Sequence, residues 1–479
     1  MLAVIPAGEW LPDQPEYGNK GALVAKNVIP GINGYGPVNS LSEAYGALNA
    51  RAQGHFSCKD KSANTYNYAG TISKLYSLTG GSWSDLSASV YTTPADTFWE
   101  FAQWNETVIA TNGVDVLQRA SLGATAFIVL PGAPPVAKHI GVVKDFVVLG
   151  NTTDNPNEVR WSAINNSESY TITVATQADN QYLYGDGGSI QRVVGGEFGT
   201  IFQEKQIVRM QYVGPPAVFQ FEVIDRNRGA LTPGAVIPVG DLSFYLSDSG
   251  FYVFDGSKSF PIGDQKVDKF FFQTVDLSYI SRMHGAADPE RKIATWVFPG
   301  SGSSAGTPNK ALFYNWGIQR WSYAEFNSEC LAQFLSPGYT LEQLDTFGTV
   351  ETLSASMDSR QWTGGRLSFG AFTTNHKIGT FSGTVLTGTV DTGEVAHKQG
   401  RRSLVTNTRP IVEGNSATVA VGSRNLLSAS PMFGNAISQT ASGYCPQRVD
   451  ARYHRYRIST SDFDWIQGVE VEVEPGGER

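Results

Sequence analysis

The sequence contains few cysteines and no long apolar run. Cys58, Cys330 and Cys445 are its three cysteines in 479 residues, and they lie far apart. An odd and widely spaced set does not predict a disulfide framework, so we expect free thiols in a reducing compartment. No stretch of about eighteen apolar residues occurs, and prolines and acidic residues interrupt the first thirteen positions. We therefore expect neither a membrane span nor a secretory signal.

Charge is also scarce. Charged residues make up 17% of the chain, and 36 Lys and Arg against 44 Asp and Glu give a formal charge of −8. This balance excludes a protein that covers nucleic-acid phosphates with its whole surface, so any contact with DNA must be local. The hydrophobic share of 41% is large enough for a substantial core.

Glycine, proline and aromatic residues are abundant instead. The chain has 51 Gly and 23 Pro, and aromatics reach 12%, a balance typical of many short strands joined by tight turns. Between residues 66 and 372, apolar or alternating runs are bounded by Gly, Asn, Asp or Ser. The clearest predicted strands are 98–111, 140–149, 206–213, 218–224, 242–246, 251–254, 293–298 and 311–316.

A loose repeat appears within this stretch. The segments 74–87, 250–263 and 311–325 each combine an apolar strand, a Gly-containing turn and an aromatic return strand. Such hairpins favour a β-propeller, and a β-sandwich is the structural alternative. We predict an all-β fold with an N-terminal arm in residues 1–60, a β-propeller core in 61–372 and a smaller C-terminal β-region in 373–479.

Two local predictions belong to this scheme. Asn112-Gly113 supplies the positive φ of a hairpin turn, with the return strand over 114–117. The Ala-rich piece 41–53 permits a helix within the arm.

Motifs for catalysis or cofactor binding are weak. Residues 302–306 match G-x-S-x-G, but Gly/Ser linker sequence surrounds the match, so we interpret it as a loop and not as a nucleophile elbow. The six histidines lack metal-ligand spacing, and the Gly-rich run 185–189 lacks the helix that a phosphate loop needs. We predict no catalytic residue, no cofactor and no metal, and hence a protein that is not an enzyme.

Carboxylates leave one enzymatic alternative open. A propeller glycosidase needs two carboxylates flanking the scissile bond at the central mouth. Turn formation by local hydrogen bonds is the favoured interpretation of the candidates, which are Asp145, Asp248, Asp255, Asp264 and Asp268.

The most distinctive charged segment is RVDARYHRYRIS, residues 448–459. Its arginines alternate with Tyr453 and Tyr456, and Arg and Tyr are enriched in protein interfaces and can also bind phosphates and bases. In a strand, Arg448, Asp450, Arg452 and His454 would share one face, and Asp450 would partly cancel the charge of its neighbours. We favour an interface or strand surface over direct DNA contact.

Several phrases of the sequence resemble the tail hub or nozzle proteins of short-tailed bacteriophages, including the packaged-DNA stabilisation proteins. The clearest is WLPDQPEYGNKG at residues 10–21. The other similar phrases are 25–30, 34–37, 68–71 with 74–76, 244–263 and 452–455.

This resemblance implies a structural virion protein that acts in the phage tail and in viral genome packaging. It implies a ring, usually of six copies, below the portal and adaptor rings, assembled in the bacterial cytoplasm. Such a ring retains packaged double-stranded DNA, conducts it without sequence specificity at ejection, and docks tail fibres or spikes. We expect its assembly surface at Arg452, Tyr453, Arg455 and Tyr456, with Trp10 and Tyr17 anchoring the arm.

Two other functions remain open at this stage. The first is a propeller carbohydrase acting on a bacterial surface glycan, which an inward-facing carboxylate pair would distinguish. The second is a binding propeller that recognises a partner through its loops without forming a ring.

Overall fold

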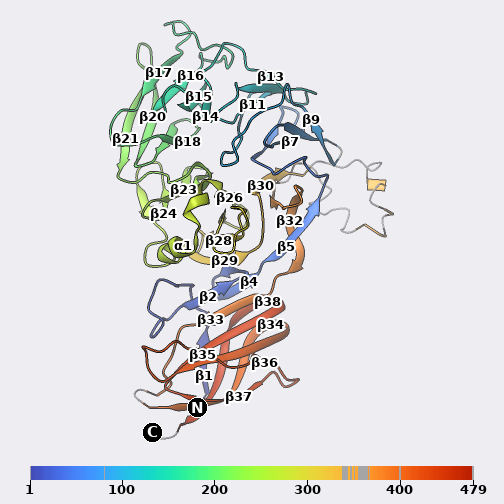
Figure 1. The fold of residues 1–479 in the computed structure, drawn as a ribbon, viewed down its shortest axis with the longest axis vertical. Coiled ribbons are helices and arrows are strands. Elements are labelled where there is room, and N and C mark those ends of the chain that lie inside the picture. The colour runs from blue at the N-terminus through green and yellow to red at the C-terminus, as the bar shows by residue number, and fades with distance from the viewer. Residues whose placement is uncertain are drawn as a thin grey trace.

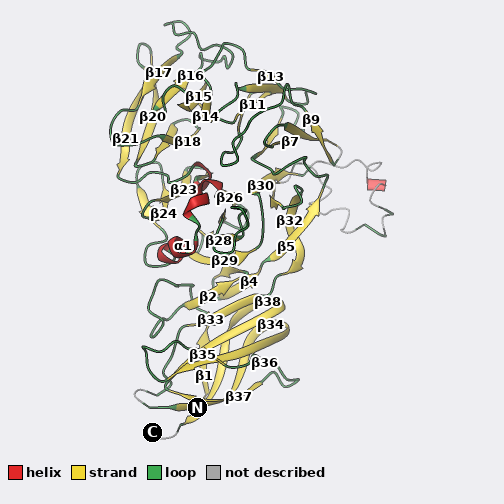
Figure 2. Ribbon diagram, viewed as in Figure 1, coloured by secondary structure: helices red, strands yellow, loops and turns green. Residues whose placement is uncertain are grey.

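The protein is built almost wholly from short antiparallel strands, as Figure 2 shows. The computed structural model describes residues 2–79, 81–336, 344–345, 348–349, 351–353, 365, 367–398 and 401–476. A short α-helix, α1 (Asp268–Thr274), and two 3-10 turns at Pro233–Ala235 and Leu277–Arg282 interrupt the strands.

Six separate four-stranded sheets are arranged as the blades of a β-propeller. Five of these sheets follow one another along the chain. In each of the five, the first strand in the sequence is the inner strand of the blade and the last is the outer strand. They are β6 (His55–Lys59), β7 (Thr65–Gly70), β8 (Leu75–Thr79) and β9 (Ser82–Asp85); β10 (Glu100–Trp104), β11 (Thr107–Thr111), β12 (Gln118–Ser121) and β13 (Ile128–Val129); β14 (Ala137–Val143), β15 (Phe146–Thr152), β16 (Glu158–Trp161) and β17 (Asp179–Tyr182); β18 (Ile190–Val194), β19 (Gly199–Gln203), β20 (Gln206–Gly214) and β21 (Val218–Arg226); and β22 (Ile237–Val239), β23 (Leu242–Ser247), β24 (Gly250–Phe254) and β25 (Ser259–Pro261).

The sixth sheet closes the ring with a strand from the other end of the chain. Its inner strands β30 (Cys330–Leu335), β31 (Leu367–Phe372) and β32 (Ile378–Val385) are joined by β5 (Asn39–Ala44), which pairs antiparallel with β32. Strand β30 contacts β6 of the first blade. The ring is therefore held shut by backbone hydrogen bonds between residues more than 300 positions apart.

The remaining place in the ring is filled by strands of a larger sheet. Strands β26 (His284–Asp288), β27 (Ile293–Phe298), β28 (Lys310–Asn315) and β29 (Arg320–Glu325) pair in order, and β26 lies between β22 and β30. Strand β29 then pairs with β2 (Ala22–Lys26) through Lys26 and Tyr323. Backbone pairing thus runs directly from the propeller into the region below it.

That region is a curled sheet, which we call the platform. It is dominated by two long antiparallel strands, β34 (Ser403–Arg424) and β38 (Tyr453–Pro475). Figure 1 shows it below the propeller, with both chain ends at its far end. Its other strands are β1 (Leu2–Pro6), β2, β4 (Gly34–Pro37) with its partner β3 (Val28–Gly31), β33 (Gly388–Thr392), β35 (Met432–Phe433), β36 (Ile437–Ser438) and β37 (Cys445–Ala451).

One hydrophobic core spans the propeller and the platform. Phe251 and Trp296 of the propeller belong to the same buried cluster as Val390 and Ile458 of the platform. Smaller clusters fill the spaces between successive blades. The two regions therefore do not have separate cores.

The fold class predicted from the sequence is confirmed: the chain is all-β with a propeller core and an additional β-region. The domain limits lie elsewhere, because β6 begins at His55, β5 completes the last blade, and β32 ends at Val385. The arm is also more than a peripheral segment, since β1, β2 and β4 are platform strands.

Several local predictions differ from the structure. The ranges 98–111 and 140–149 each hold a hairpin, with turns at Asn105 and Lys144, which adopt φ of 51° and 52°. The return strand after Gly113 begins at Gln118, because the Asn112 side chain accepts hydrogen bonds from the Val114 and Asp115 amides, which hold these residues in a loop. The piece 41–53 contains strand β5 and no helix, because pairing with β32 outweighs its helix propensity.

Candidate functional site

The phrase WLPDQPEYGNKG forms a loop that lies between the propeller and the platform. We call residues 7–21 the arm loop. Trp10 is fully buried, its ring packs on Phe270 and Tyr323 at centroid distances of 4.9 and 5.1 Å, and its Nε1 donates to the Leu23 carbonyl at 3.2 Å. Trp10 therefore anchors the arm loop within its own chain.

Polar residues of the arm loop bind the propeller at a second place. Both oxygens of Asp13 accept backbone hydrogen bonds at 2.8 Å, from Lys269 and Phe270 in the first turn of α1. Glu9 forms an ion pair with Lys266 at 2.7 Å just before that helix. The carboxylate of Asp13 thus satisfies amides that a helix start leaves without intrahelical partners.

The shape of the arm loop depends on Asn19 and Gly21. Asn19 donates to the Leu11 carbonyl at 3.0 Å and accepts from the Gly21 amide at 2.8 Å. A Cβ at position 21 would collide with the Glu9 carbonyl oxygen. A glycine is therefore required where the loop crosses itself.

The other end of the arm loop meets a buried ionic cluster in the platform. Asp391 of β33 is fully buried and accepts from Arg455 at 2.9 Å and from Arg457 at 2.8 Å with each oxygen. Because side chains alternate along a strand, the two arginines of β38 lie on the same face, and the register places Asp391 opposite Arg457. The carboxylate is thus shared by two guanidinium groups.

The platform strands leave space for these guanidinium groups. On the other side of β38, Gly422 faces Arg455 and Ala420 faces Arg457. The Phe433 ring fills the space that the small residues leave, with its centroid 4.1 Å from the Arg457 guanidinium carbon. This geometry adds a cation–π contact to the ion pairs.

A second carboxylate extends the cluster to the arm loop. Glu394, which is 1% exposed, binds Arg424 through both oxygens. Glu16 of the arm loop lies 3.2 Å from Arg424 and 3.4 Å from Arg455. Hydrogen bonds to Asp391 and Glu394 raise the pKa values of Arg457 and Arg424, so these two guanidinium groups stay protonated.

Two histidines lie on the opposite face of β38. His397 Nε2 and the Tyr456 hydroxyl are 2.7 Å apart, and His454 lies 5.4 Å from His397 between ring centroids. Burial, and then the neighbouring His397, lower the pKa of His454 to about 4. Both rings are therefore neutral near pH 7.

The structure corrects part of the predicted assembly surface. Tyr456 is fully buried and Arg455 is 9% exposed, and both contact their own chain. Trp10 is likewise buried. These three side chains are not available to another copy. Strand β38 directs Arg455 and Tyr456 into the platform, and the arm loop buries Trp10 at the junction with the propeller.

Arg452 and Tyr453 do reach the surface. The chain bends at Arg452 between β37 and β38, so Arg448 and His454 lie on different strands and the predicted common face is not formed. Tyr453 packs against Tyr17 of the arm loop, with ring centroids 5.0 Å apart. The Arg452 amide binds Asn425 at 3.2 Å.

The loop after β34 gives this corner an apolar surface. Leu426, Leu427 and Met432 are 61%, 47% and 78% exposed. Arg424 holds the loop through the carbonyls of Leu427 and Ala429. Together with Arg452 and Tyr453, these three residues form what we call the corner surface.

Two of the acidic residues proposed from the sequence accept backbone hydrogen bonds. Asp255 accepts from the Ser257 and Lys258 amides, which confirms its role in a turn. Asp268 accepts from the Phe251 amide, and burial raises its pKa to about 7. The G-x-S-x-G match lies in turns followed by strand β28, so it lacks the helix of a nucleophile elbow.

Two other carboxylates line the central cavity of the propeller. Glu100 binds Arg192 at 2.8 Å and His139 at 2.9 Å, and Asp96 binds Arg282 at 2.8 Å. Each carboxylate is thus already engaged by a cation or an imidazole. In the part of the chain that the structure describes, no group of three or more His, Cys, Asp or Glu side chains is arranged to hold a metal ion.

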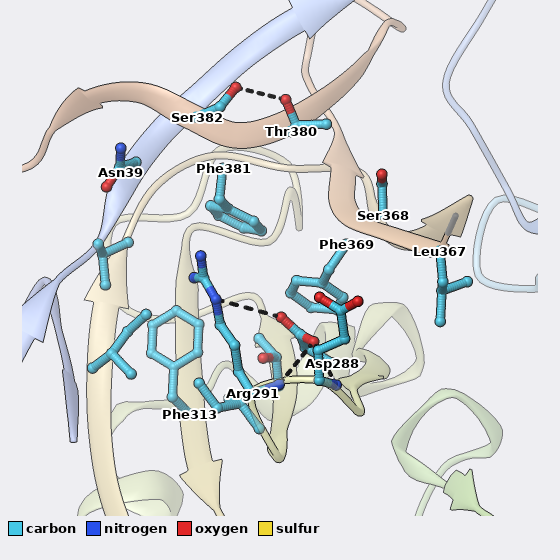
Figure 3. Close-up of a pocket in the computed structure, with 15 residues that line it drawn as sticks. Asn39, Asp288, Arg291, Phe313, Leu367, Ser368, Phe369, Thr380, Phe381 and Ser382 are labelled. Atoms are coloured by element: carbon cyan, nitrogen blue, oxygen red, sulfur yellow. Dashed lines mark hydrogen bonds and ion pairs between the residues drawn. The ribbon is translucent and has the colours of Figure 1, made fainter. Parts of the chain in front are cut away.

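A further cavity, of about 280 Å³, lies beside the strands that close the ring. Figure 3 shows Phe369 and Phe381 on one side and Phe313 on the other, with Arg291 reaching Asp288 at 3.9 Å. The two rings of the closing blade stack at 5.7 Å. This cavity is an aromatic-lined gap between β26–β29 and the last blade.

Comparison with known proteins gives no family. No family model and no curated protein matches the sequence. Matches among solved structures include the computationally designed Ika8 protein, with 7% identity, TM-score 0.39 and coverage of 78% of this chain and 99% of that one. The Pan2 WD40 domain of Neurospora crassa has 8% identity, TM-score 0.37 and coverage of 59% and 83%.

A third solved structure is the extracellular domain of the one-component system BT4673 from B. thetaiotaomicron. It has 10% identity and TM-score 0.40, and the match covers 85% of this chain and 47% of that one. Separately, none of the described helices has the length and apolar character needed to cross a membrane.

Proposed function

We propose that this chain is a structural subunit of a short phage tail, a hub or nozzle that assembles into a ring, with six copies as the expected number. In this role it retains packaged DNA, conducts it at ejection, and docks the adaptor ring and the tail fibres or spikes. The sequence resemblance suggested this function, and the arm loop gives it a physical basis.

The observation that carries the proposal is the position of the arm loop. Residues of the phrase contact both regions: Asp13 and Trp10 contact α1, Trp10 also packs on Tyr323 of the propeller, and Glu16 joins the ionic cluster of the platform. A subunit that bears load between two rings needs its two regions fixed relative to each other. This loop, the shared core and the β2–β29 pairing provide that fixation.

The corner surface is the proposed contact between copies. It combines exposed aliphatic side chains with Arg452 and Tyr453, a composition typical of interface centres. A closed ring requires this surface to meet a different patch on the next copy, because head-to-tail contacts generate rings.

The carbohydrase alternative finds less support. The carboxylates that line the central cavity are both engaged in ion pairs, whereas a glycosidase needs one free nucleophile or base and one protonated acid. The ring-forming subunit is therefore the function that we propose.

The experiment is sedimentation velocity on the full chain and two charge-reversal variants. Arg452→Glu places an acidic group on the corner surface and is expected to abolish assembly while leaving the far-UV circular dichroism unchanged. Arg226→Glu makes the same change on an exposed position of outer strand β21 and serves as the matched control. Equal assembly of the two variants would contradict the role of the corner surface.

A further inference from the structure

The lower part of the platform is an open sheet with two unpaired edges. Its strands lie in the order β1, β38, β34 and β37, and each neighbouring pair is antiparallel. Figure 1 shows β1 and β37 at the far end of the platform. Among the described strands, none pairs with the outer edge of β1 or with the outer edge of β37. Such an edge is a template for pairing with a further strand.

Strand β1 directs two residues toward its unpaired edge. The Ala7 amide, which continues the register of β1 on β38, donates to the Gln467 carbonyl at 2.7 Å. Hydrogen-bonded pairs alternate along antiparallel strands, so Ile5 bonds to β38, whereas Leu2 and Val4 turn their N–H and C=O groups outward. The Leu2 and Val4 side chains are 61% and 59% exposed. An exposed apolar edge of this kind favours association with another strand.

Strand β37 offers the second edge. The Gly476 amide donates to the Arg402 carbonyl at 3.2 Å, so the backbone of Arg402 faces β38 and that of Ser403 faces β37. Ala451, which pairs with Ser403, therefore bonds to β34, and Asp450 turns its amide outward. The Asp450 carbonyl accepts from the Arg402 guanidinium at 3.0 Å. The amide is thus the group that Asp450 offers to an added strand.

The two edges are complementary in direction. Because four strands alternate in direction, β1 and β37 run opposite to each other. Repetition of the sheet head to tail places β1 of one copy antiparallel to β37 of the next, and head-to-tail contacts generate rings. Arg452 of the corner surface directly follows β37. The β37 edge and the corner surface therefore lie on one continuous side of the subunit.

The charges on the outer face of this sheet agree with a second copy as the occupant. Arg448 of β37 is exposed, and among the described residues it has no ion-pair partner. Val4 pairs with Glu470 of β38, whose carboxylate lies 3.6 Å from Arg409. The alternating glutamates on this face of β38 are Glu470, Glu472 and Glu474. Pairing of β1 with β37 brings Arg448 of one copy within two strand spacings, about 10 Å, of these carboxylates on the next.

We propose that the β1 edge of one copy pairs antiparallel with the β37 edge of the next copy, so that a continuous sheet links neighbouring subunits. Backbone groups of Leu2 and Val4 bond to β37, where the Asp450 amide is one of the donors, and the corner surface extends the contact. This inference rests on the proposed ring and names the surface that the next copy offers.

The test is sedimentation velocity on the full chain and two proline variants. Val4→Pro removes one outward amide and keeps the bonds of β1 to β38, so it should weaken association by about tenfold or more with unchanged far-UV circular dichroism. Val129→Pro is the matched control on outer strand β13, because the Leu130 amide donates to Leu117 at 2.8 Å and the Val129 amide therefore also points outward. It should leave association within about twofold.

Hydrogen exchange on the unmodified chain keeps the test decisive if Val4→Pro does not fold. The amides of Leu2, Val4 and Asp450 should exchange about tenfold or more slowly in rings than in subunits dissociated by dilution, and that of Val129 equally fast in both. If rings form but β1 or β37 gains no protection, or Val4→Pro assembles like the unmodified chain, this pairing is overturned and the ring-forming function stands. A chain that stays monomeric would overturn both.

Discussion

The propeller and the junction with the platform are stabilised by different chemistry. Between blades, buried aliphatic and aromatic side chains such as Phe202 and Tyr245 pack in contact. At the junction, Asp391 and Glu394 bind three arginines, and two of these arginines also bind Glu16 of the arm loop. Apolar packing tolerates exchange of similar volumes, whereas removal of one partner from a buried ionic cluster leaves an uncompensated charge. We therefore expect the junction to be more sensitive to a single substitution than the blades.

The largest expected effect comes from breaking the ionic cluster. Asp391→Asn removes the buried counter-charge that Arg455 and Arg457 share and leaves Arg455 only the more exposed Glu16, which is expected to cost about 3–5 kcal/mol of the free energy of unfolding. Urea denaturation measures it, with exposed Asp241→Asn as the control. A loss below about 1 kcal/mol would show that the cluster does not hold the junction.

Acid should weaken the junction next. Burial lowers the pKa values of His454 and His397. As the pH falls below about 6.5, these histidines therefore bind protons in the unfolded chain before they do so in the folded chain. Stability is then full above about pH 6.5 and falls as the pH decreases toward about 4. His55 and His284 act in the same direction.

The variant His454→Leu isolates the junction in this pH range. It removes one of the four groups and is expected to reduce the loss of stability between pH 6.5 and 4 by about 1–2 kcal/mol. Thermal unfolding across this range measures the difference. An unchanged slope would mean that His454 titrates normally in the folded protein.

A stabilising change is expected next to α1. Burial raises the pKa of Asp268 to about 7, so this group lowers stability as the pH rises from about 4 through 7. Asp268→Asn keeps an acceptor for the Phe251 amide and is expected to stabilise the protein at pH 8 by about 1–2 kcal/mol. At pH 4 the gain should vanish, and a gain that is equal at both values would contradict the assignment.

The smallest expected effect tests the tolerance of the blades. Phe202→Leu lies in an apolar cluster between two blades and is expected to cost about 1 kcal/mol, because neighbouring side chains can repack. Urea denaturation of Phe202→Leu and Asp391→Asn under the same conditions compares their losses of unfolding free energy directly. A larger loss for Phe202→Leu than for Asp391→Asn would reverse the proposed division between the two regions.

The sequence predicts local strands better than their partners. The apolar runs at 242–246 and 251–254 correspond to β23 and β24, because their pattern is set by neighbours a few residues away. The pairing of β5 with β32, or of β1 with β38, joins residues more than 300 positions apart. No periodic pattern marks those partners, so the closing strand was not expected at 39–44.

The candidate site was predicted in part. The segment 448–459 and the arm phrase drew attention through their composition, and Glu16 and Tyr17 of the phrase do meet Arg455 and Tyr453. Asp391 and Glu394 lie in a Thr/Gly-rich run that gives no sign of burial. Only the register in which β33 pairs with β38 places Asp391 next to Arg455 and Arg457.

The most direct test of the central proposal is negative-stain electron microscopy with native mass measurement, on the purified chain alone and after mixing with the candidate adaptor ring. Closed rings of one stoichiometry, or rings docked onto the adaptor, are the predicted result. A monomer that persists in both conditions would contradict the assignment of this chain as a tail hub subunit.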